Sequence, residues 1–342
     1  MNSPLFRLAA FVVAFAATFA DGQVPVEELP PLRRSFGEVA APIPPFPEGR
    51  FEPRPGETIA FLGGTEVFDF DRHAFLEAGL HLAWPERKLR WRNLAWQGDT
   101  IFHQARPLYF YTRKGDPQAG SIPDHRERTE PGIVVIGFGK MESLEGVERL
   151  PNFVAAYAAL LDSLAPLTAR VVLLAPAPFF PSGPAASEVN SRNEALRRYV
   201  EAIRELAEQR GLLFIDGFGP LLGDLNAACS DNGVHLNEAG HRVFAAHLLG
   251  RLGASVPIAA GADSARVQSL RQAILRKNRL WQQYYRPSNW AFLFGDRQHV
   301  PASRDAKNRD ERWFVREIDR IPSLLAASEA DIHRYARPAD RP

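Results

Sequence analysis

The sequence predicts an α/β protein: a three-layer α/β/α sandwich around a mainly five-stranded parallel sheet, with a helical appendage at its C-terminal end. Two observations predict this fold. Five short apolar runs alternate along the chain with amphipathic helical patterns, as in parallel crossover units. In addition, a chain of 342 residues that is 45% hydrophobic and 24% charged has enough apolar material for one large core and an appendage.

The first 56 residues are expected to precede the folded domain. We interpret residues 1–20 as a secretory signal peptide, because Arg7 is followed by the apolar stretch 8–19 and by small residues before a cleavage point after Ala20. An uncleaved N-terminal anchor is the alternative. Residues 21–56 contain nine prolines and little periodicity, which is typical of an extended linker or of a strap over the domain surface.

The predicted domain spans residues 57–253. Its clearest helix is 193–209, where one apolar stripe is surrounded by charged residues and Gly211 follows as a stop signal. His235 is expected to open the last helix. In chain order, the other predicted elements are a strand at 58–62, a helical pattern at 68–84, strands at 89–94 and 133–137, a helix at 147–164, and strands at 170–175 and 212–216.

Residues 254–342 are predicted to form a helical, aromatic-rich C-terminal extension. An Ala/Gly-rich segment at 254–263 precedes a predicted helix at 265–281. An irregular aromatic and basic stretch follows at 284–295, and a polar helix is predicted at 309–334. No apolar run beyond the first 20 residues approaches the length of a membrane span, so after signal cleavage the chain is not predicted to be an integral membrane protein.

Charge and cysteine content exclude several classes of partner. The chain has 41 basic and 40 acidic residues, so no net field favours nucleic acid, and we predict no nucleic-acid partner. The single cysteine, Cys229, cannot form an intramolecular disulfide; we interpret it as a small buried hydrophobe, with a dyad with His235 as the alternative. The histidines lack metal-ligand spacing, so no metal and no cofactor are predicted.

The residues with chemical potential follow the predicted strands. The turn Gly63-Gly64-Thr65 follows the first strand, 96–100 the second and 138–143 the third. In the segment 230–241, Asp231 and Asn232 stand four and three residues before His235, as in the base and orienter of a nucleophilic triad. Because sites in parallel sheets form at the carboxyl ends of the strands, we expect these loops to meet.

Together these four segments resemble the SGNH (GDSL-type) hydrolase superfamily over residues 58–252. Phe61-Leu62-Gly63-Gly64-Thr65 is similar to the nucleophile block, with Thr65 where the family has serine, and Gly98 matches the glycine of the second block. Phe138-Gly139-Lys140-Met141-Glu142 is similar to the third block, with Met141 where the oxyanion-binding asparagine is expected. In the last block, Asn232 takes the place of the aspartate three residues before His235.

The resemblance implies a flavodoxin-like SGNH fold and hydrolysis of an ester, such as an acyl ester on a carbohydrate, by an exported protein of the periplasm, cell envelope or extracellular space. Thr65 would attack, His235 would act as base, and Asp231 or Asn232 would orient it. Oxyanion and substrate contacts would come from Gly64, Gly98, Gly139 and Met141. The C-terminal segments 277–281 and 286–295 resemble the tail of a planctomycete-type group of exported SGNH-like proteins.

Two of these residues weaken catalysis. The β-methyl group of Thr65 restricts χ1 and crowds the line of attack. Met141 has no donor, and losing a side-chain oxyanion donor costs about 3–4 kcal/mol of transition-state stabilisation. Three hypotheses therefore remain. The protein is an ester hydrolase acting on a small-molecule or glycan ester, or a non-catalytic protein that binds a glycan or partner in the same cleft, or a scaffold whose aromatic C-terminal segment docks a partner.

Each hypothesis predicts a different geometry. The hydrolase requires the Thr65 hydroxyl within hydrogen-bonding reach of His235, with allowance for loose geometry in the absence of substrate. The binding protein requires only the cleft, and Thr65 would then cap the helix that follows. The scaffold predicts an exposed apolar patch over 284–294. Glu142 is either a surrogate acid or a solvated loop carboxylate.

Overall fold

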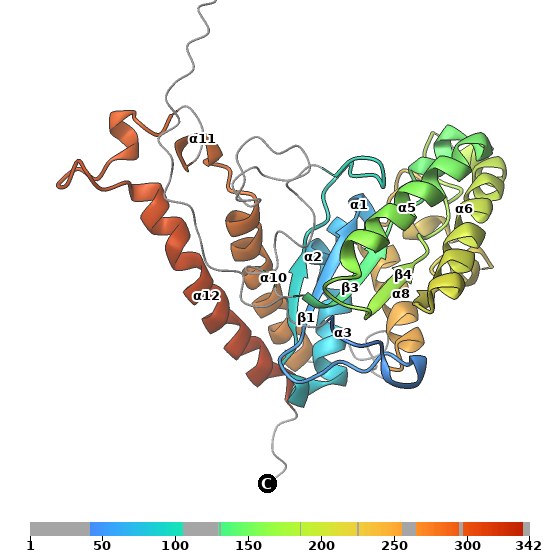
Figure 1. Cartoon of the computed structure of the whole chain (residues 1–342), viewed down its shortest axis with the longest axis horizontal. Helices are drawn as coiled ribbons and strands as arrows, with labels where there is room; N and C mark the ends of the chain where they lie inside the picture. Colours follow the sequence, from blue (N-terminus) through green and yellow to red (C-terminus); the bar gives the residue numbers. More distant parts are fainter. Residues whose placement is uncertain are drawn as a thin grey trace, which may run out of the picture. The chain divides into compact units, whose positions relative to one another are not determined.

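The computed structural model describes residues 42–104, 129, 131–184, 186–223, 226–254, 265–293 and 297–337 (Figure 1). All of them belong to one compact unit that spans 41–342. The predicted signal peptide at 1–20, and the part of the proline-rich segment up to residue 41, lie outside the described residues.

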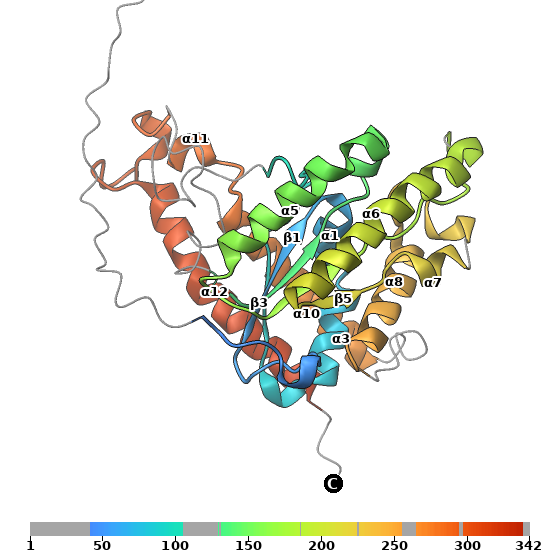
Figure 2. The same cartoon turned by 45° about the vertical axis from the view of Figure 1, so that its right-hand side comes forward.

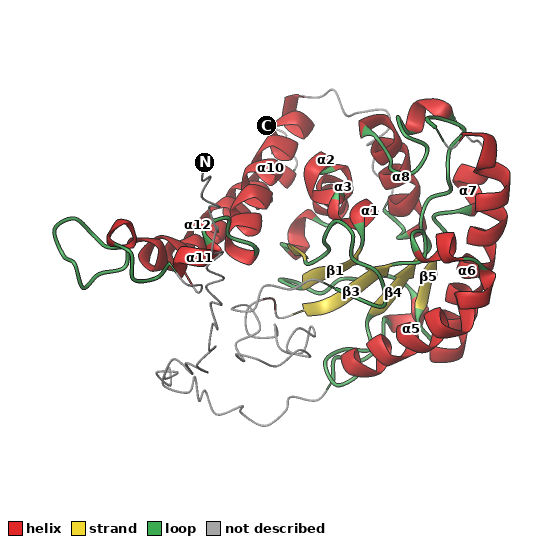
Figure 3. Ribbon diagram, turned by 90° about the horizontal axis from the view of Figure 1, so that it is seen from above, coloured by secondary structure: helices red, strands yellow, loops and turns green. Residues whose placement is uncertain are grey.

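A five-stranded, fully parallel sheet forms the centre of this unit (Figure 3). The strand order β2-β1-β3-β4-β5 puts β1 and β3 side by side, with Phe61 paired to Val135. The chain leaves this central pair in opposite directions, and this switch point is where ligand crevices open in such sheets. All five strands were predicted to within two residues: β1 (Thr58–Gly63), β2 (Arg90–Asn93), β3 (Pro131–Gly137), β4 (Val171–Leu174) and β5 (Leu213–Ile215).

Helices cover both faces of the sheet and complete the three predicted layers (Figure 3). One face carries α5 (Leu150–Leu164) and α6 (Val189–Arg210), and α6 ends at the predicted stop, Gly211, in a left-handed conformation with φ 62°. The other face carries α1 (Thr65–Phe68), α2 (Phe70–His73), α3 (Phe75–Ala83) and α8 (Glu238–Arg251). A further short helix is α7 (Gly219–Leu222).

The helical pattern predicted at 68–84 is interrupted in the structure. Ala74 adopts a left-handed conformation with φ 57° and separates α2 from α3. Ala74 is fully buried, and Phe70 and Phe75 on either side of it are also buried. The apolar spacing predicted the buried positions, whereas the change of direction at Ala74 depends on packing and costs backbone energy that spacing does not reveal.

Residues 42–56 run along the domain as a strap. Ile43 forms a parallel bridge with Thr168, and the Phe46 side chain is buried. Beneath the strap, Arg170 Nη1 donates to both carboxylate oxygens of Glu57, at 2.8 and 3.0 Å, and the guanidinium lies 4.6 Å from the centroid of the Phe46 ring. A fully buried arginine therefore joins this segment to the start of the sheet.

The C-terminal helices α10 (Ala265–Tyr285) and α12 (Trp313–Ala336) pack against each other and against α3 (Figures 1 and 2). Trp281 is 1% exposed and donates from Nε1 to the Asn93 carbonyl oxygen at 2.7 Å, which attaches α10 to the end of β2. None of the described helices has both the length and the apolar character needed to cross a membrane.

The described residues of the aromatic stretch after residue 284 do not form the exposed patch that the scaffold hypothesis requires. Tyr285 lies at the end of α10, is fully buried and stacks on Trp281 with ring centroids 5.6 Å apart. Leu293, in the short helix α11 (Trp290–Leu293), is also buried. Phe292 packs on Phe314 of α12 at 5.1 Å. The described part of the stretch therefore contributes to packing within the extension.

A buried polar cluster lies between the sandwich and α10. Asp71 accepts hydrogen bonds from Trp91 Nε1 at 2.7 Å and from Gln282 Nε2 at 3.2 Å. Glu77 Oε1 lies 2.6 Å from Lys277 Nζ, and both side chains are almost completely buried. Burial raises the pKa of Asp71 to about 6, although Lys277 opposes the shift.

Asp71→Asn is expected to flatten part of the pH dependence of stability. The native pKa of Asp71 lies above its unfolded value, so its contribution to stability is complete below about pH 4 and is lost as the pH rises through about 6. From pH 4 to 7, the unfolding free energy of the wild type should therefore fall relative to that of Asp71→Asn by roughly 2–3 kcal/mol. Urea denaturation measures the unfolding free energy of both proteins at each pH. A difference between the two that does not change with pH would contradict the prediction.

Candidate active site

A small pocket of about 30 Å³ lies where β1 and β3 end. Of the residues predicted from sequence, Thr65, Gly64, Gly139, Met141 and His235 line it. Its remaining lining residues are Glu66, Asp99, Gly137, Phe138, Lys140, Glu142 and Pro176. The loops after β1, β2 and β3 and the loop before α8 thus meet at one edge of the sheet, as parallel topology requires.

Thr65 is the first residue of α1, and its hydroxyl faces the loop after β2. Thr65 Oγ1 accepts a hydrogen bond from the Gly98 N–H at 3.4 Å, and no side-chain cap is present on α1. Gly98 has φ 80°, which favours glycine. A Cβ atom on Gly64 would lie 2.8 Å from the Asp99 carbonyl oxygen, so glycine at 64 allows the two loops to approach.

The His235 loop is held by its own polar groups. Asn232 Oδ1 accepts the N–H groups of Val234 and His235, both at 2.9 Å, and the Ser230 hydroxyl donates to the His235 carbonyl oxygen at 2.6 Å. Asp231 instead accepts a hydrogen bond from the Asn237 side chain at 2.8 Å. Asn237 also caps α8, which begins at Glu238, three residues later than predicted.

Within the described residues, no hydrogen bond joins the His235 ring to the predicted orienters Asp231 and Asn232. Instead, Asn232 Oδ1 accepts backbone N–H groups and Asp231 Oδ1 accepts a hydrogen bond from Asn237. Within the described residues, no hydrogen bond joins Thr65 to the His235 ring either, although both side chains line the same pocket. The structure therefore brings the candidate nucleophile and the candidate base into one pocket, but it does not show the hydrogen-bonded triad of a serine hydrolase.

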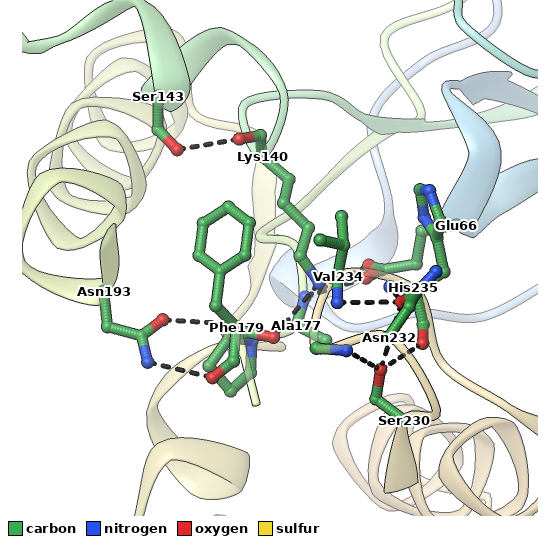
Figure 4. A network of polar contacts seen from close by, with 12 residues as sticks. Glu66, Lys140, Ser143, Ala177, Phe179, Asn193, Ser230, Asn232, Val234 and His235 are labelled. Carbon is green, nitrogen blue, oxygen red and sulfur yellow. Dashed lines mark hydrogen bonds and ion pairs between the residues drawn. The ribbon is translucent and has the colours of Figure 1, made fainter. Parts of the chain in front are cut away.

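A buried ion pair that the sequence analysis missed forms one wall of the pocket (Figure 4). Lys140 Nζ lies 3.5 Å from Glu66 Oε2 and donates to the Pro178 carbonyl oxygen at 3.1 Å. Glu66 Oε1 accepts the Ala177 N–H at 3.1 Å. The side chains of Lys140 and Glu66 are only 7% and 11% exposed. Glu66 directly follows Thr65, and Lys140 lies in the third block. Their positions within these motifs could therefore have indicated that both belong to the site.

The surroundings of His235 favour its neutral form. Burial lowers the pKa of His235, the Lys140 ammonium lowers it further, and the Glu66 carboxylate opposes both. A neutral imidazole can accept a proton, which is what a general base requires.

Glu142 connects two site loops. Its carboxylate accepts the Ile101 N–H at 2.6 Å and the Gly139 N–H at 2.8 Å. The residue is 3% exposed, so it is not a solvated loop carboxylate. Burial raises the pKa of Glu142, and the two backbone donors oppose that shift. Because the Gly139 N–H is bound to Glu142, it is not directed at a substrate oxygen in this arrangement.

Met141 is 38% exposed at the pocket rim and offers no hydrogen-bond donor.

The described residues contain no group of three or more histidine, cysteine, aspartate or glutamate side chains that could hold a metal ion. Cys229 is buried and packs in the core beside α8, as predicted for a small hydrophobe.

Comparisons with known proteins agree with this architecture. The model of the GDSL-like Lipase/Acylhydrolase family matches residues 69–243, about half of the chain. The match contains Gly98, Met141 and His235 and begins just after Thr65. A comparison with curated proteins found no match.

One solved structure is similar in fold to most of this chain. BT4096, a gut microbial diltiazem-metabolizing enzyme, superimposes with a TM-score of 0.57 at 14% identity, over 85% of this chain and 98% of its own. That coverage extends the likeness in fold into the C-terminal helices. Axe2, an acetylxylan esterase from Geobacillus stearothermophilus, covers 58% of this chain and 95% of its own, with a TM-score of 0.42 and 21% identity.

Proposed function

We propose that this chain, which belongs to the GDSL-like lipase/acylhydrolase family, hydrolyses an ester with Thr65 as nucleophile and His235 as general base. The observation that carries the proposal is one pocket lined by both Thr65 and His235, beside which the Gly98 N–H donates to the Thr65 hydroxyl. These are the three groups that acyl transfer needs: an attacking oxygen, a proton acceptor and an oxyanion donor.

In the first step, Thr65 Oγ1 attacks the ester carbonyl carbon while its proton passes to a ring nitrogen of His235. The carbonyl oxygen becomes an oxyanion. The Gly98 N–H, which contacts the Thr65 hydroxyl at 3.4 Å in the resting structure, then turns to the oxyanion and stabilises it together with the N–H of Thr65. Collapse of the intermediate breaks the bond to the alcohol, and the imidazolium returns the proton to the leaving oxygen. Water then attacks the acyl-threonine by the same route and releases the acid.

The substrate we propose has a short acyl group, carried on a small molecule or a carbohydrate. The pocket beside Thr65 has about 30 Å³ of free volume, which is room for one or two small groups and not for a long chain. Hydrolysis rates should therefore fall from p-nitrophenyl acetate to the butyrate and octanoate esters. Equal rates for the three esters would contradict an acyl-binding role for this pocket.

The test of the activity is p-nitrophenyl acetate hydrolysis by the wild type, Thr65→Ala and His235→Ala. We expect turnover by the wild type and the buffer rate for both variants, because each removes a group that acts in the same step. Ser191→Ala, on the exposed surface of α6, serves as a matched hydroxyl control and should retain the wild-type rate. Turnover that persists in both site variants would exclude this pocket as its source.

A second candidate function is binding of a glycan or partner in the same cleft without turnover. It is favoured by the absent Thr65–His235 hydrogen bond within the described residues and by Met141 at the oxyanion position. If the wild type and both variants match the buffer rate, this second function gains support. Calorimetric titration with acetylated oligosaccharides would then test it.

We further propose that the chain is exported, on the grounds of the sequence of residues 1–20. Expression with the native N-terminus followed by mass determination of the envelope and extracellular fractions tests this proposal. A mature form that begins at Asp21 is expected, whereas an intact N-terminus in a membrane fraction would support an anchor instead.

A further inference from the structure

The buried Glu66–Lys140 pair has a position that packing alone does not explain. Two charged side chains taken out of water incur a desolvation cost that their attraction only partly offsets. Here both belong to the wall of the pocket and come from different elements, Glu66 from α1, directly after Thr65, and Lys140 from the loop after β3. A costly pair in this place points to a role in the pocket.

Lys140 is held in a fixed position by groups on three sides. Its ammonium contacts Glu66 and the Pro178 carbonyl oxygen, and it lies 5.3 Å from the centroid of the Phe179 ring. The Phe179 backbone is in turn bracketed by Asn193 of α6, which accepts its N–H at 2.8 Å and donates to its carbonyl oxygen at 3.0 Å (Figure 4). These contacts anchor the positive charge to the sandwich at the wall of the pocket.

We propose that the Glu66–Lys140 pair, in the wall of the pocket that His235 also lines, sets the charge state of the His235 imidazole. Lys140 disfavours a second positive charge and so keeps the resting imidazole neutral. Glu66 partly offsets this effect, so that the neutral imidazole can still accept the Thr65 proton. Both residues act through His235. This inference deepens the proposed function and rests on it for its effect on rate.

Two charged groups act on the pKa of His235: Lys140, on the loop after β3, which lowers it, and Glu66, on α1, which raises it. The carboxylates of Asp99 and Glu142 line the same pocket. On α8, burial, with His73 and Lys140 adding to it, lowers the pKa of His241 to about 3, so His241 is uncharged at neutral pH. Asp231 and Glu238, which are nearer in sequence, have carboxylates exposed at the surface. In addition to burial, the pair therefore supplies the two charges that act on the pKa of His235.

The test measures the titration midpoint of His235 by NMR with ¹³C-labelled histidine, using His235→Asn to assign its resonance. Lys140→Met should raise the midpoint by about one pH unit, because the cation is lost and Glu66 remains. Adding Glu66→Gln in the double variant should bring the midpoint back down. Lys140→Gln provides a second replacement should the methionine variant fold poorly.

Arg198→Met is the matched control, since it removes a cation of an exposed Arg–Glu pair on α6, away from the pocket. Its His235 midpoint should equal that of the wild type. An unchanged or lower midpoint in both Lys140 variants would overturn the proposal, as would a double variant with the same midpoint as Lys140→Met.

The readout also separates this proposal from the proposed hydrolysis. If the enzyme is active, the acid limb of the kcat/KM profile should move to higher pH in Lys140→Met, by the same shift that NMR records. If the expected NMR shifts occur without any esterase activity, the hydrolysis proposal fails while the control of His235 by the pair stands. If the pair had only a structural role, its variants would lower the free energy of unfolding. The titration midpoint of His235 and the acid limb of the kcat/KM profile would then stay unchanged.

Discussion

Lys277→Met is expected to lower the free energy of unfolding by about 3–5 kcal/mol, because it leaves the Glu77 carboxylate buried without its cation. Glu77 Oε1 lies 2.6 Å from Lys277 Nζ, and the two side chains are 2% and 1% exposed. Burial by itself would raise the pKa of Glu77, but Lys277 and then His81 hold it below its usual value.

This pair joins the sandwich to the C-terminal extension, with Glu77 on α3 and Lys277 on α10. A loss of about 3–5 kcal/mol is a large part of the 5–15 kcal/mol that stabilises typical domains. Guanidinium unfolding measures the loss, and limited proteolysis should show earlier cleavage within the extension. Both readouts follow from removing the ion that attaches α10 to α3.

Two further variants make the interpretation specific. The double variant Glu77→Gln/Lys277→Met should recover most of the lost stability, since neither side chain is then charged. Arg279→Met, an exposed position on the same helix, should change stability by less than about 0.5 kcal/mol. A double variant as unstable as Lys277→Met would show that packing of the lysine stem, and not its charge, supports the extension.

Met141→Asn is expected to raise kcat/KM for p-nitrophenyl acetate by roughly a hundredfold or more, because it restores a side-chain donor where the oxyanion forms. Met141 lines the pocket and is 38% exposed, so its replacement disturbs little packing. Its backbone angles, φ −72° and ψ −36°, suit asparagine without strain.

Met141→Leu is the control for this substitution, since leucine keeps the apolar shape and adds no donor. It should leave the rate near that of the wild type. The gain in Met141→Asn should appear in kcat more than in KM, because the oxyanion exists only in the transition state and intermediate. Equal rates for the asparagine and leucine variants would show that position 141 does not face the reacting carbonyl.

The sequence by itself determined the strands, the order of the layers and the loops that form the site. Apolar runs such as 133–137 lie in the fully buried strand β3, and the stripe of α6 faces the core, because periodicity records which side of an element avoids water. Parallel connections then require that the loops carrying Thr65, Gly98 and His235 meet at one edge. Fold and family follow from these local signals.

Only the tertiary structure decided which polar side chains act on one another. Glu66 and Lys140 are 74 residues apart in the sequence, and they meet because β1 and β3 are neighbours in the sheet. Likewise, the Asp231 side chain turns to Asn237, and Glu142 is buried between two loops. Hydrophobic periodicity carries no information about such pairs, because each depends on the geometry with which separate loops pack at the end of the sheet.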